Sequence, residues 1–224
     1  MVVPANFSDI LPLTALGDAN FAAAGLTVTS KRERKVRFGP VYQENTPQLV
    51  YRSGSTMPKT LADLICILVV VAGSCHEEKL EMLKLDYPDL SWHTNEELES
   101  NELLILVWEQ LIEYTIADSN ELSVNRHFYP ELKPAFAISP PESLAWAFPR
   151  SEDDSLFNAA GTFFEKIRED GTLERLIDRY YGHIGKFDYV GTRRYLAHIE
   201  QRLPQYKDFF IEAANEIGMD WRLL

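Results

Sequence analysis

The stretch Leu68-Val69-Val70-Val71-Ala72-Gly73-Ser74-Cys75-His76-Glu77 decides the fold class of this 224-residue chain. Its unbroken aliphatic start is typical of a strand that is covered on both faces. Gly73 and Ser74 then predict a tight turn and the beginning of a helix over 75–84. A strand, a turn and a helix form a βα unit, which favours an α/β fold with parallel strands.

Strands and helices are expected to alternate on both sides of this unit. The hydrophobic pattern predicts strands over 20–24, 48–52, 114–117, 133–138 and 144–148. It predicts helices over 9–16, 101–110, 154–168 and 172–181, and a basic helical turn capped by Ser30 with Glu33. Beyond residue 187 two amphipathic helices, 193–202 and 206–217, are expected on either side of Pro204.

The charge of the chain argues against one class of partner. With 22 basic and 34 acidic residues the formal net charge is −12, whereas sequence-independent nucleic-acid binding relies on clustered bases. The acids are concentrated in residues 61–133, which hold 15 of them against 4 bases. An acidic middle segment between two balanced ones is what a separate middle lobe would give. We expect no nucleic-acid partner.

The sequence carries no recognisable catalytic, cofactor or metal motif. Its five histidines and two cysteines show no metal-ligand spacing, and the histidines are interpreted as surface or packing residues. Cys66 and Cys75 flank the predicted strand, too far apart to bridge. The longest apolar run, 65–72, is much shorter than the roughly 20 residues that span a bilayer, so we expect neither direct membrane insertion by this chain nor an export signal within it.

The segment Ala23-Ala24-Gly25-Leu26-Thr27-Val28-Thr29-Ser30-Lys31-Arg32, followed by Val36-Arg37-Phe38-Gly39-Pro40-Val41-Tyr42, resembles the hallmark of family 3 extracellular solute-binding proteins. Residues 170–182 resemble the closing helix of the same family. The resemblance implies a type II periplasmic-binding-protein fold: α/β, with two lobes of mostly parallel sheets flanked by helices. Residues 1–47 plus 142–183 would form lobe 1, without the family's first strand, and residues 48–141 would form lobe 2.

The resemblance also implies a ligand between the lobes. Arg32 matches the arginine that holds a ligand carboxylate, with Thr27 beside it, and a planar guanidinium suits that task. Ser74 would assist from lobe 2, and Asp118 would receive an amino group. Each position also has a structural interpretation: a base-rich surface helix for Arg32, and helix N-caps for Ser74 and for Asp118 with Glu121.

A more particular resemblance is to bacterial lytic murein transglycosylases in which a solute-binding-like domain precedes a lysozyme-like catalytic domain. It rests on residues 38–52, 69–76, 114–122 and 187–193. It implies that residues 184–224 are a linker and the first helix of a truncated catalytic domain, whose acid glutamate would follow Leu224. No catalytic residue is therefore expected in this chain.

Three functions follow from these resemblances. The first is a regulatory domain that binds a muropeptide or an amino-acid-like ligand and acts on its cognate catalytic domain, in the periplasm, in a parent protein attached to the outer membrane. The second is a free solute-binding protein of an amino-acid importer, which would not need residues 187–224. The third is part of an active transglycosylase, if the chain continues.

Overall fold

A computed structural model describes residues 6–64, 68–182 and 202–217 of the chain. Met1–His183 forms one compact unit and Ile184–Leu224 a second. Cys66 and the predicted helix over 193–202, except for Arg202, lie outside the described residues. None of the described helices is long and apolar enough to cross a membrane.

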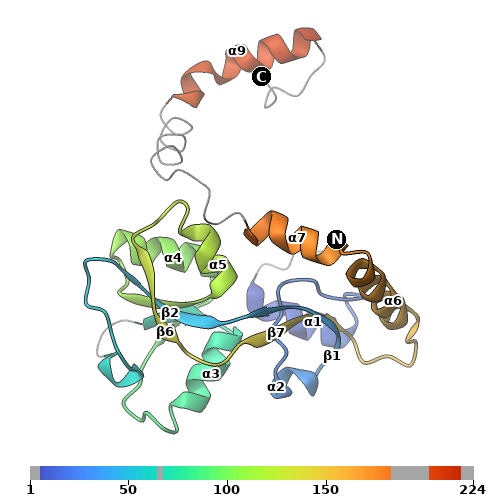
Figure 1. Ribbon diagram of the computed structural model, residues 1–224, viewed down its shortest axis with the longest axis horizontal. Coiled ribbons are helices and arrows are strands. Elements are labelled where there is room, and N and C mark those ends of the chain that lie inside the picture. Colours follow the sequence, from blue (N-terminus) through green and yellow to red (C-terminus); the bar gives the residue numbers. More distant parts are fainter. Residues whose placement is uncertain (1–5, 65–67, 183–201, 218–224) are drawn as a thin grey trace. The chain divides into compact units, whose positions relative to one another are not determined.

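A five-stranded sheet with the order β4-β3-β5-β2-β6 forms the larger part of the first unit (Figure 1). Its strands are β2 (Pro47–Arg52), β3 (Leu68–Val71), β4 (His93–Asn95), β5 (Tyr114–Asp118) and β6 (Leu132–Ala137). β3 runs parallel to β4 and β5, as the βα unit predicts, whereas β2 is antiparallel to β5 and β6. Only Thr46 separates β2 from the preceding strand, so no helical crossover constrains its direction.

Helices cover both faces of this sheet, which explains the unbroken apolar run in β3. The covering helices are α3 (Cys75–Leu83), α4 (Ser100–Glu109) and α5 (Ser119–Asn125), and a short 3-10 helix spans Leu61–Asp63. Val70 and Ile116 pack with Leu80 of α3 in one cluster. Val50 and Ala117 face the other way and pack with α4 and α5. We call β2 to β6 with these helices the five-stranded part.

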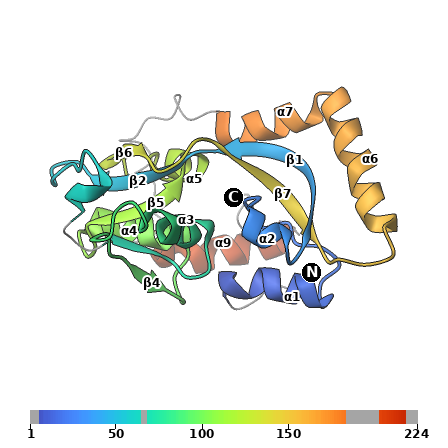
Figure 2. The same ribbon diagram turned by 90° about the horizontal axis from the view of Figure 1, so that it is seen from below.

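The remainder of the first unit is built on two antiparallel strands, β1 (Arg37–Asn45) and β7 (Glu142–Phe148). Its helices are α1 (Ile10–Leu16), α2 (Ser30–Glu33), α6 (Ser155–Glu169) and α7 (Thr172–Ile177), with a 3-10 turn at Phe7–Asp9 and a π-helical turn at Asp178–Gly182. We call these elements the two-stranded part. In both views it lies to one side of the five-stranded part, and the chain crosses between them at the β1 to β2 and β6 to β7 connections (Figures 1 and 2). The exact lobe boundaries stay a prediction.

Several sequence predictions need correction here. The strand expected over 20–24 is reduced to a single bridge between Ala22 and Ala147 at the free edge of β7. Gly25, with φ +62°, turns the chain out of the extended conformation directly after this segment. β1 and β4 were not predicted. β1 contains Gly39 and Pro40 and two register irregularities, so it lacks the regular alternation by which a strand is recognised.

In the second unit, α9 spans Leu203–Ile217 and confirms the last predicted helix. Pro204 is its second residue and does not break it. Proline is tolerated there because the amide groups of a first helical turn have no partner within the helix.

Candidate ligand-binding site

The turn that carries Arg32 is capped by Thr29, not by Ser30 as predicted. Thr29 has extended backbone angles, and its Oγ1 accepts a hydrogen bond from the Arg32 amide at 3.2 Å. A cap residue must be extended and precede the first helical residue, and Ser30 is already helical. This places Arg32 in the single turn of α2 with its side chain directed inward, only 2% exposed.

The Arg32 guanidinium joins the two parts of the first unit. Its Nε donates to Oε1 of Glu78 at 3.2 Å, and its Nη2 donates to the carbonyl of Gly73 at 3.2 Å, both in the five-stranded part. Its Nη1 donates to the carbonyl of Thr27 at 3.4 Å. The interpretation of Arg32 as a residue of a surface helix is therefore wrong, because the chain itself surrounds its charge.

Thr27 and Ser74 lie close to this guanidinium. Thr27 is bridged to β7, and its Oγ1 donates to the sulfur of Cys75 at 3.3 Å. Ser74 caps α3: its Oγ accepts from the Glu77 amide at 3.3 Å, as its structural interpretation predicts. Ser74 is buried, at 6% exposed, so its hydroxyl lies at the covered start of α3.

Asp118 occupies the N-cap position of α5, and the Glu121 side chain accepts a hydrogen bond from its backbone, as the structural interpretation predicts. The Asp118 side chain itself makes no capping bond. One carboxylate oxygen lies 3.4 Å from Nε2 of His76, and the other accepts from Nδ2 of Asn45 at 3.4 Å. His76 is only 7% exposed, and its imidazole pairs with Asp118 in place of the packing role expected for the histidines.

The buried charges shift one another. Burial alone would lower the pKa of His76, but the charge of Cys75 and the bond to Asp118 outweigh it and raise the pKa well above 6.5. Burial would raise the pKa of the Cys75 thiol, yet His76 and Arg32 lower it. Burial raises the pKa of Glu121, and the charge of Asp118 adds to that rise. The start of α3 is thus a compact group of interacting charges.

The structure brings the four predicted residues together around the start of α3. Arg32 contacts Thr27, Thr27 contacts Cys75, and His76 links that turn to Asp118. Glu78 and His76 were missed as members of this group. The only signal in the sequence was complementary charge, a base-rich turn at 31–35 and an acid-rich helix start at 77–81.

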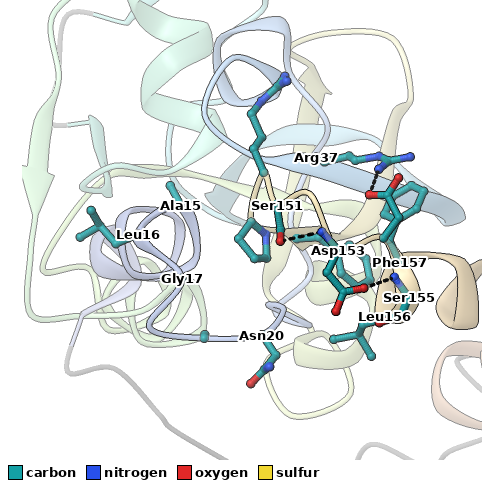
Figure 3. Close-up of a pocket in the computed structure, with 15 residues that line it drawn as sticks. Ala15, Leu16, Gly17, Asn20, Arg37, Ser151, Asp153, Ser155, Leu156 and Phe157 are labelled. Carbon is teal, nitrogen blue, oxygen red and sulfur yellow. Dashed lines mark hydrogen bonds and ion pairs between the residues drawn. The ribbon is translucent and has the colours of Figure 1, made fainter.

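A pocket of about 390 Å³ lies elsewhere, in the two-stranded part (Figure 3). It is lined by the end of α1, the start of β1 and the segment that leads into α6. Arg37 borders it, pairs with Asp154 at 2.5 Å and lies over the ring of Phe157 at 3.5 Å. None of the four predicted ligand-binding residues lines this pocket.

Metal ligation finds no support in the described part of the chain. No group of three or more histidine, cysteine or acidic side chains is arranged there to hold an ion. The His76 imidazole hydrogen-bonds to the Cys75 thiol and to the Asp118 carboxylate. These three groups therefore bond to each other and are not arranged around a common ion.

Comparison with known proteins agrees with this architecture. The family model of bacterial extracellular solute-binding proteins, family 3, matches residues 1–183. The chain belongs to this family. Among solved structures, a mutant of ArgBP from T. maritima superposes with a TM-score of 0.72 at 18% identity, covering 81% of this chain and 77% of that one. An ancestral arginine-binding protein bound to arginine gives 0.71 at 20% identity, covering 80% and 79%. These likenesses establish the type II periplasmic-binding-protein fold.

Curated relatives show to which kind of protein with such a domain this chain is similar. Membrane-bound lytic murein transglycosylase F 1 of Alkalilimnicola ehrlichii is 46% identical over 226 residues, which cover 100% of this chain and 46% of that protein. Membrane-bound lytic murein transglycosylase F of Saccharophagus degradans is 42% identical over 220 residues, covering 98% and 44%. This member of family 3 therefore spans less than half the length of these relatives.

Proposed function

We propose that this chain is the regulatory ligand-binding domain of a peptidoglycan lytic transglycosylase, and that it binds a muropeptide or amino-acid-like ligand between its two lobes. The family 3 match over residues 1–183 and the names of the curated relatives support this proposal. The observation that carries it is the buried guanidinium of Arg32, which lies between the two parts and faces a carboxylate.

Each predicted residue has a role that its position allows. Arg32 and Thr27 would hold the ligand carboxylate, and Ser74 would donate from the start of α3. Asp118 would receive the ligand amine at the end of β5. Closure of the lobes on the ligand would shift a two-state equilibrium that residues 184–224 pass to the catalytic domain.

The cellular setting belongs to the same proposal. Both curated relatives are named as membrane-bound. The parent protein would act in the periplasm, attached to the outer membrane, with its cognate catalytic domain as the partner of this one.

A second function is favoured by the solved structures. Their titles name amino-acid and arginine binding, which suits a free solute-binding protein of an importer. The match of the transglycosylase relatives over 98–100% of this chain favours the first function, because it includes the tail that an importer protein would not need.

Isothermal titration calorimetry of the 224-residue chain separates the two functions. The first predicts heat from a disaccharide tetrapeptide released from peptidoglycan and loss of that heat in Arg32→Ala. Arg34→Ala is the matched control, because Arg34 is exposed in the same turn. Tight binding of one free amino acid without heat from the muropeptide would sink the first function. Equal muropeptide binding by Arg32→Ala and the natural chain would remove the site.

A further inference from the structure

The partner of Arg32 is a carboxylate that the chain itself supplies. Glu78 accepts from Nε of Arg32 at 3.2 Å through Oε1, and from Oγ1 of Thr29 at 3.0 Å through Oε2. Both donors belong to the turn that is proposed to hold a ligand carboxylate. A guanidinium and a hydroxyl that converge on two carboxylate oxygens form a complete carboxylate site, and Glu78 fills it.

The second charged residue that is predicted to bind the ligand also has a partner within the chain. Asp118, the proposed partner of a ligand amine, faces the His76 imidazole at 3.4 Å. His76 and Glu78 both belong to the first turns of α3. One helix start therefore presents an anionic group to Arg32 and a basic group to Asp118, the two groups that an amino acid would present.

We propose that Glu78 is an internal competitor of the ligand: it occupies Arg32 in the unliganded protein, holds α2 against α3, and is displaced when a ligand carboxylate binds. This inference rests on the proposed function for the identity of the ligand. The contact between Glu78 and Arg32, which we call the closing contact because it holds the two parts of the first unit together, does not depend on the proposed function.

Two other described ion pairs join the two parts. Lys79 of α3 pairs with Glu142 of β7 at 2.9 Å, with side chains 29% and 17% exposed, so it is more exposed than the Arg32 pair at its base but not at its acid. Lys31 and Glu81 also join α2 to α3, at 3.2 Å, but their side chains are 60% and 54% exposed. Exposed pairs of this kind contribute little, because water already solvates both charges. The Arg32 and Glu78 side chains are 2% and 18% exposed. Glu81→Gln is therefore a matched control for Glu78→Gln on the same helix.

Cys75 reports on the closed state because its sulfur accepts from Thr27 across the same contact. The experiment measures alkylation of Cys75 by iodoacetamide in a Cys66→Ser background, at the high-pH plateau, where the thiolate fraction no longer changes. Glu78→Gln is expected to raise the rate roughly tenfold, as loss of a charge-assisted bond implies, and Glu81→Gln to leave it within about twofold. Equal rates for the two variants would overturn the closing role of Glu78.

Ligand exchange is tested by calorimetry with the disaccharide tetrapeptide and with the same compound amidated at its carboxylates. Removing an internal competitor should make Glu78→Gln bind the free acid roughly tenfold more tightly than the natural chain, with no gain for the amide. Unchanged or weaker binding of the acid would show that Glu78 supports Arg32 and would overturn competition. If neither protein binds the muropeptide while Cys75 reacts faster in Glu78→Gln, the closing contact is supported and the proposed function fails.

Discussion

We expect the Arg32 guanidinium to contribute strongly to the free energy of unfolding of the first unit. The substitution Arg32→Met tests this. Methionine keeps the straight aliphatic chain and removes the charge. Loss of one partner from a buried ion pair costs about 3–5 kcal/mol, and two backbone carbonyls also lose a donor. Because 18% of the Glu78 side chain is exposed, water stabilises part of the unpaired charge. We expect a loss of about 3 kcal/mol.

Chemical denaturation followed by circular dichroism measures the loss in free energy of unfolding. Thermal denaturation measures the accompanying fall in melting temperature. For a chain of this size about 3 kcal/mol corresponds to a fall of roughly 6–12 °C in the melting temperature. Arg34→Met, at an exposed position of the same turn, should stay within about 0.5 kcal/mol of the natural chain. In Glu78→Leu, Arg32→Met should cost at least about 1.5 kcal/mol less, because the two residues are coupled. A loss under about 1 kcal/mol, or an additive double variant, would refute the buried-pair argument.

Two further predictions concern the start of α3. The pKa of His76, raised well above 6.5 against burial by the charge of Cys75, should fall in Cys75→Ala when imidazole resonances are titrated by NMR; an unchanged pKa would contradict the pairing. The stability that His76 contributes is present below its unfolded pKa of about 6.5 and is lost as the pH rises through the raised folded pKa. Gly73→Ala should destabilise by about 2 kcal/mol and speed alkylation of Cys75, because Gly73 has φ +69° and an added Cβ would lie 3.0 Å from Cβ of Ser8. Gly54→Ala, with φ +96° and open space around it, should cost only the backbone strain and leave that rate unchanged; equal rates for both variants would refute the steric argument.

The five-stranded part could be predicted where local signals agree. In β3 four aliphatic residues are all buried, and they lead directly into a turn and a capped helix. Here the pattern, the turn residues and the cap indicate the same structure. The direction of β2 could not be predicted in this way. It depends on how the chain enters the sheet from β1, and no periodicity within 47–52 records that.

The residues of the ligand-binding site could likewise be predicted only in part from the sequence. The family resemblance named four residues, and the structure gathers them around the start of α3. Glu78 was not foreseen, because its partner lies 46 positions earlier in the chain. An acid in the first turn of a helix is also favoured by the helix dipole alone. Pairing over such a distance is a property of the fold, which a sequence pattern within one segment does not contain.

Displacement of Glu78 would have a defined mechanical consequence. Leu80 is fully buried in the main cluster of the five-stranded part, so α3 is fixed to that sheet. Leu26 and Val36, on either side of Arg32, are fully buried in the core of the two-stranded part. Packed cores move as units rather than deform. When the Arg32 contact breaks, the motion must therefore occur at the connections through Thr46 and through residues 138–141, where the chain crosses between the two parts.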